Sequence, residues 1–235
     1  MSVVVLFFAL LVGLGFWWLS RQRLFARPWL EQGVIDEGVP QFRLSHDPAK
    51  RVGLGLLIAI IGALFTLVVG AWFMRRELGD WQPLPVPDIL WFNTGALVLS
   101  SIVLEGTQRA VRRARLAQVR AGLIAGALLA IVFLVGQLLA WQQLVALGFL
   151  VSSNPANSFF YLVTGLHGLH ILGGLVALGW AILKSWRSDR PEAVRLNVEL
   201  CATYWLFMLF VWVVLFSLLA GWAGSFVDFC MQLFR

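Results

Sequence analysis

Long apolar runs constrain this chain more than any other feature of its sequence. A membrane-spanning helix needs roughly 20 predominantly apolar residues, and six stretches meet or approach that length: 3–19, 52–74, 89–106, 121–140, 157–183 and 195–222. Hydrophobic residues make up 60% of the 235 residues, which is more than a soluble domain of this size could bury. The sequence therefore predicts an all-α, polytopic transmembrane helix bundle with about six membrane-spanning helices.

Basic residues gather in three of the segments that connect these runs. Segments 20–51, 107–120 and 184–195 hold fifteen of the eighteen Lys and Arg residues. Because cytoplasmic loops are enriched in Lys and Arg, this pattern puts the three segments in the cytoplasm and both termini on the periplasmic side of a bacterial inner membrane. The net charge of +6 then reflects topology, and nucleic acid is not an expected partner.

The same pattern divides the chain into three parts. Residues 1–19 are expected to form a retained N-terminal transmembrane anchor, because basic residues follow the apolar run instead of preceding it as in a signal peptide. Residues 20–51 form a cytoplasmic linker, and residues 52–235 form a five-helix membrane domain. In the linker, Arg21, Arg23 and Arg27 are candidates for binding anionic lipid headgroups.

The stretch "FFYLVTGLHGLHILGG" places His167 and His170 near the middle of a predicted span. Their spacing of three puts both on one helix face, and they are either metal or haem ligands or polar groups that pin helices together. A bis-histidine haem draws on two facing helices, and a copper or zinc site needs further ligands at the same depth. The third histidine, His46, lies in the linker. The pattern favours polar groups that hold helices together, and we expect no catalytic, cofactor-binding or metal-binding residue in this chain.

Depth along the helices suggests partners for these polar groups. At about 1.5 Å per residue, His167 and Ser100 lie at similar levels, so Ser100 or Ser101 is the expected partner, directly or through one water. Glu199 lies near a cytoplasmic helix end, where Arg195 can reach it. We expect these groups to be structural.

Four segments, in order, resemble one family. "NPANSFFYLVTGLHGLHILGGLVAL" resembles the sixth-helix signature of haem–copper oxidase subunit III, in which T-G-x-H-G-x-H follows a polar turn. "GDWQPLPVPDILWFNTGALVLSSIVLE" and "GQLLAWQQL" resemble earlier segments, and "ELCATYWLFMLFVWVVLF" resembles the last helix, with its acidic residue followed by Y-W-H-F-x-D-x-x-W. The resemblance covers about residues 51–222 and adds Tyr204 to the interhelical polar residues.

The chain departs from the family pattern at three polar positions. Leu206 and Leu209 stand where the family has a histidine and an aspartate, and Ile61 stands where it has a membrane-buried glutamate. The family groups are discussed in relation to proton uptake and lasting activity of the catalytic subunit, which this chain cannot support with these residues. Members have seven helices or a five-helix core, whereas this sequence predicts the core plus one N-terminal helix.

The resemblance implies a non-catalytic subunit III-like component of a respiratory oxidase that reduces O2 to water and pumps protons. Haem and copper are then expected in partner subunits, with subunit I as the main contact, subunit II and small subunits as further partners, and phospholipid bound. One alternative is the subunit III-like accessory protein of nitric oxide reductase, which the lost carboxylates favour and the N-terminal extension disfavours. A small transporter would need a charge-lined path or broken midplane helices, and the sequence offers neither.

Overall fold

The computed structural model describes residues 48–188 and 190–222, and every regular element among them is a helix. The helices are α2 (Pro48–Arg76), α3 (Ile89–Arg112), α4 (Leu116–Ala146), α5 (Pro155–Arg187) and α6 (Pro191–Leu219). Each is long and apolar enough to cross a membrane. This confirms the all-helical membrane bundle for five of the predicted spans. The first predicted span, 3–19, lies outside the described residues.

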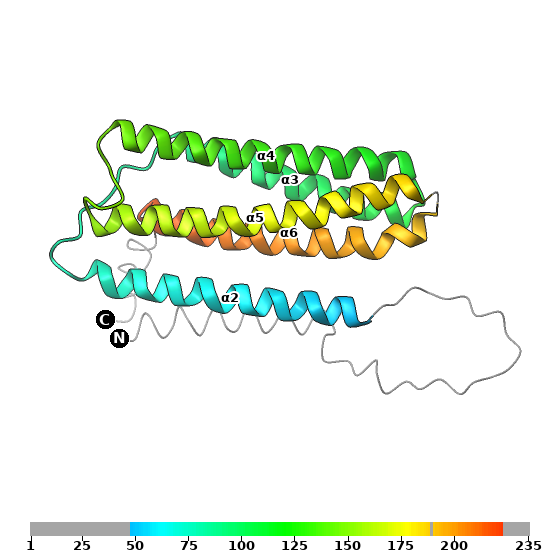
Figure 1. Cartoon of the computed structure of the whole chain (residues 1–235), viewed down its shortest axis with the longest axis horizontal. Helices are drawn as coiled ribbons and strands as arrows, with labels where there is room; N and C mark the ends of the chain where they lie inside the picture. The colour runs from blue at the N-terminus through cyan, green and yellow to red at the C-terminus, as the bar shows by residue number, and fades with distance from the viewer. Residues whose placement is uncertain (1–47, 189, 223–235) are drawn as a thin grey trace, which may run out of the picture.

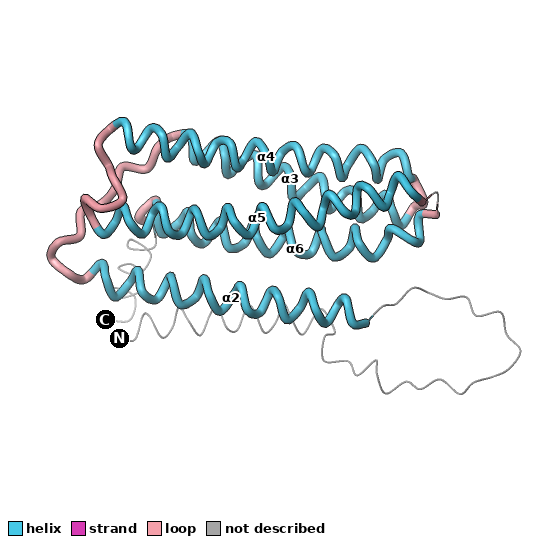
Figure 2. The backbone as a smooth tube through the Cα atoms, in the orientation of Figure 1, coloured by secondary structure: helices cyan, strands magenta, loops and turns pink. Residues whose placement is uncertain are grey.

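Four of the five helices contain the whole apolar run that predicted them and extend beyond it, whereas α6 begins before its run, 195–222, and ends three residues before the run does, at Leu219. The run 89–106 belongs to a helix that ends at Arg112, and the run 121–140 to one that covers Leu116–Ala146. A hydrophobic run marks only the part of a helix that suits hydrocarbon, whereas the backbone ladder continues into the polar headgroup region. The α3–α4 and α5–α6 connections are therefore short, as Figure 2 shows.

The five helices run side by side along the long axis of the molecule (Figure 1). Helix α6 packs against α3, α5 and α2, while α4 packs against α3 and α5. Helix α2 lies at one edge and contacts only α5 and α6 among the described helices to a substantial extent. Helix α6 is thus the centre of the bundle and α2 its most peripheral described member.

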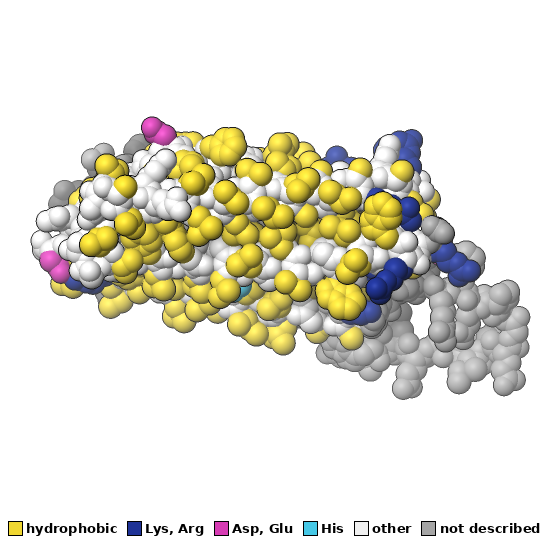
Figure 3. Space-filling model, turned by 45° about the horizontal axis from the view of Figure 1, so that its top comes forward, with side chains coloured by type: hydrophobic (Ala, Val, Ile, Leu, Met, Phe, Trp, Pro, Cys, Tyr) yellow, Lys and Arg dark blue, Asp and Glu magenta, His cyan; other side chains and the backbone are white. Residues whose placement is uncertain are grey.

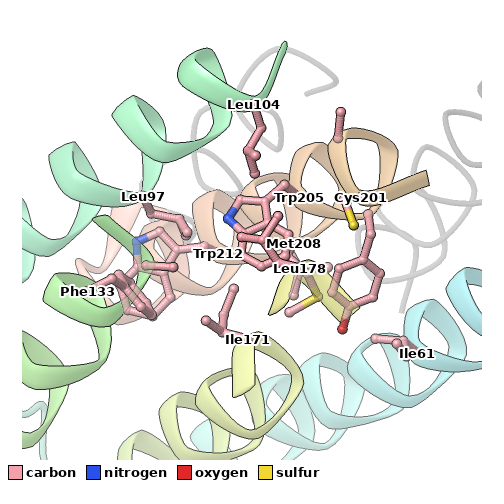
Figure 4. Packing of buried hydrophobic residues seen from close by; sticks show 14 of the residues in the cluster. Ile61, Leu97, Leu104, Phe133, Ile171, Leu178, Cys201, Trp205, Met208 and Trp212 are labelled. Carbon is pink, nitrogen blue, oxygen red and sulfur yellow. The ribbon is translucent and has the colours of Figure 1, made fainter. Parts of the chain in front are cut away.

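Large side chains of α6 fill the core. Trp205, Met208 and Trp212 are almost fully buried, and Figure 4 shows them surrounded by side chains from the other helices. Those neighbours include Leu97 of α3, Phe133 of α4, Ile171 and Leu178 of α5, and Ile61 of α2. Burying such side chains favours one arrangement of the helices because interiors pack at crystal-like density.

The described surface separates apolar and basic side chains. In Figure 3 apolar side chains cover the flank of the molecule, and Lys and Arg side chains gather at one end. Exposed apolar residues such as Leu67 (72% exposed) and Val176 (66% exposed) would be unfavourable in water but suit lipid. The chain is a multi-pass membrane protein.

Candidate functional site

The start of α5 sets the position of the two histidines. The Asn154 side chain accepts a hydrogen bond from the backbone N–H of Ala156 at 3.1 Å, and Pro155 follows as the first helical residue. Proline suits this position because its missing N–H would have no partner there. At a rise of 1.5 Å per residue, His167 and His170 lie about 18 and 22 Å along the helix, close to its middle.

His167 is fully buried at the centre of the bundle. Its Nε2 lies 3.1 Å from the backbone carbonyl oxygen of Met208 in α6. Because a carbonyl only accepts, Nε2 is the protonated nitrogen of this contact. Rings of Phe65, Phe133 and Trp212 surround the imidazole, with centroids 6.3, 5.6 and 5.1 Å away. His167 thus links α5 to α6 and touches α2 and α4.

His170 is partly buried and bonds within its own helix. Its Nδ1 lies 2.7 Å from the carbonyl oxygen of Leu166, one turn earlier, and its ring centroid lies 5.5 Å from that of Phe65. The backbone carbonyl of His170 accepts a hydrogen bond from the Tyr204 hydroxyl at 2.8 Å. Tyr204 therefore provides a second link between α5 and α6.

The prediction that Ser100 or Ser101 bonds directly to His167 is wrong, whereas a link through one water stays a prediction. Ser100 is fully buried and donates to the Gly126 carbonyl of α4 at 2.9 Å, and Ser101 donates to Leu97 of its own helix at 3.0 Å. Helix α3 packs against α4 and α6. Equal depth in the membrane fixes the height of two residues but not the direction in which their side chains point.

Two buried amides in the predicted spans were not singled out from the sequence. Asn93 of α3 and Gln137 of α4 are 0% and 4% exposed, and neither amide has a hydrogen-bond partner among the described residues. Next to Asn93, the Thr94 hydroxyl accepts a hydrogen bond from the Trp212 indole at 2.9 Å. The sequence does contain a signal that could have identified these two residues: each is an amide inside an apolar run, and an amide is costly in hydrocarbon.

Glu199 binds more arginines than the sequence predicted. Its side chain is 8% exposed, and the expected Arg195 lies one turn away with Nε 3.1 Å from Oε1. Arg51 of α2 donates to Oε2 at 2.6 Å, and Nε of Arg112 in α3 lies 3.7 Å from Oε1. We call Glu199, Arg51, Arg112 and Arg195 the Glu199 cluster. It joins the ends of three helices.

The three positions that depart from the family pattern have different surroundings. Ile61 is 3% exposed in the core, Leu209 is partly buried, and Leu206 is 51% exposed on the outside of α6. A buried carboxylate at position 61 would need a partner, whereas the exposed leucine at position 206 is a side chain that suits contact with lipid. These three positions therefore contribute apolar packing or lipid contact.

Within residues 48–188 and 190–222, no group of three His, Cys, Asp or Glu side chains is arranged to hold a metal ion. His167 and His170 each direct one ring nitrogen at a backbone carbonyl, and Cys201 is buried with a free thiol. The arrangement holds helices together through polar contacts in an apolar interior. The lipid-headgroup candidates Arg21, Arg23 and Arg27 lie outside the described residues.

Comparison with known proteins assigns this arrangement to a family. The family "Cytochrome c oxidase subunit III" matches residues 50–224, which include all of α3 to α6 and most of α2. Similar proteins are the cytochrome c oxidase subunits 3 of Thermostichus vulcanus (30% identical over 204 residues, 80% of this chain and 96% of that protein) and of a Synechocystis strain (30% over 183 residues, 74% and 76%). The subunit of Drosophila yakuba is 26% identical over 194 residues, 76% of this chain and 73% of that protein. The chain belongs to the cytochrome c oxidase subunit III family.

Proposed function

We propose that this subunit III of a haem–copper oxidase is a non-catalytic component that packs against the catalytic subunit and stabilises it. The family match across residues 50–224 carries this proposal. Subunit I is the expected main contact, with subunit II and small subunits as further neighbours. The chain works in a respiratory complex in which O2 is reduced to water and protons are pumped by the partner subunits.

Haem and copper belong to the partner subunits in this proposal. The ring nitrogens of His167 and His170 that have protein partners contact backbone carbonyls, which are structural contacts. The Glu199 carboxylate is occupied by arginines of three helices. In this proposal the two histidines and Glu199 therefore have a structural role, which is to hold the helices of the subunit together.

The proposal also covers topology and lipid. Six spans are supported by the five described helices together with the apolar run 3–19 of the sequence. The basic end of the described bundle (Figure 3) supports an orientation with both termini on the periplasmic side of a bacterial inner membrane. Bound anionic phospholipid, with Arg21, Arg23 and Arg27 as headgroup contacts, is supported by their position after an apolar run, since each basic residue near such a surface contributes about 1 kcal/mol.

One observation favours a second candidate. Apolar side chains at Ile61, Leu206 and Leu209 remove the polar groups of the oxidase pattern, as expected of the accessory protein of a nitric oxide reductase. The relatives named above all carry the oxidase name, which supports the oxidase.

Purification of the complex through a tag on the full chain tests the proposal. We expect a haem–copper oxidase that consumes O2 to co-purify, and the same oxidase from a strain without this chain to keep its haem and copper content and its reduced-minus-oxidised spectrum. A shorter active lifetime in that strain is the expected functional loss. Co-purification with an NO-consuming reductase would establish the second candidate, and loss of stoichiometric haem or copper would contradict the non-catalytic role.

A further inference from the structure

The Glu199 cluster contains more positive charge than its one carboxylate neutralises. Arg51 of α2, Arg112 of α3 and Arg195 of α6 lie 2.6, 3.7 and 3.1 Å from the oxygens of Glu199. Among the described residues, Glu199 is the only acidic side chain that forms an ion pair with any of these arginines. Each guanidinium carries several N–H donors, whereas a carboxylate accepts hydrogen bonds at about four positions. The three arginines therefore have N–H donors that Glu199 does not use.

The arginines of the cluster lie at headgroup depth and are partly exposed. The side chains of Arg51, Arg112 and Arg195 are 42%, 56% and 52% exposed. Arg112 is the last residue of α3, and Arg51 and Arg195 lie in the first two turns of α2 and α6, at the basic end of the bundle (Figure 3). Lipid headgroups lie at the depth where a spanning helix leaves the hydrocarbon. A headgroup phosphate is therefore level with the cluster.

Two of the three helices begin at this end. Helix α2 begins at Pro48 and α6 at Pro191, and the N-terminal end of a helix carries the positive end of its dipole. The N-cap residue of α6, Arg190, is basic, and Glu192 is the acidic residue of its first turn. The helix dipoles thus add to the attraction that the arginines exert on an anion.

An exposed apolar stripe runs along α6 from the cluster towards the other end of the helix. Leu206, Phe210 and Val213 are 51%, 42% and 50% exposed. They follow Glu199 by about two, three and four helical turns, so they lie on the same face of α6 as the carboxylate. We call these three residues the α6 stripe. Its side chains are of the kind that contacts acyl chains.

Helices α2 and α3 border the α6 stripe. At the basic end, Arg51 and Arg112 reach Glu199 from α2 and α3. Farther along, α2 passes beside α6 at Gly62, where an added Cβ would lie 3.9 Å from the ring of Phe207, and α3 packs against α6. The α6 stripe is therefore an apolar surface between two helices, with the Glu199 cluster at its headgroup end.

We infer that the Glu199 cluster and the α6 stripe form a binding site for one anionic phospholipid. Its phosphate accepts hydrogen bonds from the arginine donors that Glu199 does not use, as guanidinium groups favour, and an acyl chain lies along the α6 stripe. A helix of another protein segment would cover the stripe but would leave these donors unmatched, so charge complementarity selects the lipid.

This site extends the proposed lipid binding to residues of the described bundle. It consists of other residues than the linker arginines, and it does not depend on which respiratory complex contains the chain. Failure of the linker site, or of the proposed function, therefore leaves it standing, and the experiment below separates the two.

Fluorescence quenching by brominated lipids in nanodiscs locates the lipid. The full chain carries one fluorophore, at Leu206→Cys or at Leu172→Cys, in a background with Arg21→Gln, Arg23→Gln, Arg27→Gln, Cys201→Ala and Cys230→Ala. Leu172 of α5 is the matched control, because it is 52% exposed and close in depth to Leu206. That depth follows from the neighbouring Gly174, where an added Cβ would lie 2.7 Å from the ring of Tyr204.

The nanodiscs contain phosphatidylcholine with a small fraction of phosphatidylglycerol, and one of the two lipids carries brominated chains. Brominated phosphatidylglycerol should quench position 206 more than position 172, whereas brominated phosphatidylcholine should quench both alike. Equal quenching of the two positions by phosphatidylglycerol would overturn the site. Absence of quenching at position 206 by either lipid would show that protein covers the stripe, which also overturns it.

Arg112→Gln tests the arginines, because its 3.7 Å contact is the longest in the cluster. The variant should lower the preference of position 206 for phosphatidylglycerol about fivefold, and Arg112→Lys should keep most of it. Arg109→Gln is the control on the same helix, since Arg109 is 71% exposed and pairs with Glu105 at 3.9 Å; it should change the preference less. Equal losses in Arg109→Gln and Arg112→Gln would show a general surface charge effect and contradict the site.

Inorganic phosphate distinguishes a lipid phosphate from a free one. Sodium phosphate and sodium chloride at equal ionic strength should reduce the quenching at position 206 equally, because both only screen the arginines. A larger reduction by phosphate would show that the free ion occupies the cluster and would overturn the lipid assignment. If Arg112→Gln fails to fold, the comparison of positions 206 and 172 in the chain with an intact cluster decides.

Discussion

His167 lies where four helices meet, and a single nitrogen links two of them. Its Nε2–H donates to a carbonyl of α6, and its ring touches aromatic side chains of α2, α4 and α6. A polar group at this depth is tolerated because its hydrogen bond within the protein replaces the hydrogen bond that water would form with it outside the membrane. His170 differs, since its side-chain bond stays within α5.

His167→Gln should loosen the subunit more than His170→Gln. The first variant disturbs a link between helices, which is worth about 0.6 kcal/mol on average, together with ring contacts. The second disturbs a bond within one helix. Thermal release of this chain from the purified complex measures the difference, and haem and copper content should be the same in wild type, both single variants and the double variant. Loss of a metal or haem in any of them would show that a histidine is a ligand.

At the scale of helices, close packing of α5 on α6 depends on one glycine. A Cβ added at Gly174 would lie 2.7 Å from a ring carbon of Tyr204 and 2.9 Å from one of Trp205. The neighbouring Gly173 has no atom within 4 Å of such a Cβ. Both residues lie in the same helix, so replacing each of them by alanine distinguishes the effect of helix propensity from the effect of packing.

Gly173→Ala should leave the unfolding temperature unchanged or raise it, because alanine is better than glycine in a helix by roughly 0.8–1.0 kcal/mol. Gly174→Ala has the same propensity gain but overpacks the interface, which costs about 1–3 kcal/mol, so its unfolding temperature should fall. Thermal unfolding of the full chain in detergent, followed by circular dichroism, gives both values. Equal shifts in the two variants would contradict the close approach of the two helices.

At the scale of the whole molecule, the basic end of the bundle predicts its orientation in the membrane. The α3–α4 connection contains Arg113 and Arg115, and the ends of α5 and α6 nearest it carry Lys184, Arg187 and Arg195. Lys and Arg are retained on the cytoplasmic side during insertion. We therefore expect this end of the bundle in the cytoplasm and both chain termini in the periplasm.

Reporter fusions test this orientation. A reporter joined after Arg113 should be active only in a cytoplasmic assay, whereas one joined after Gly148 in the α4–α5 turn, or at Arg235, should be active only in a periplasmic assay. The reverse pattern would contradict the topology and would also move the Glu199 cluster to the outer surface.

The sequence alone determined the five described helices, because an apolar run of bilayer length satisfies its backbone hydrogen bonds in lipid as a helix. It also determined the contact of Glu199 with Arg195, which are four residues apart on one helix and so lie on the same face. Only the tertiary structure decided that His167 meets Met208 and that Arg51 meets Glu199, which are 148 residues apart. Apolar patterning sets where a residue lies along a helix, whereas the partner it meets depends on how the helices are rotated and packed, and that is settled by side chains from all of them together.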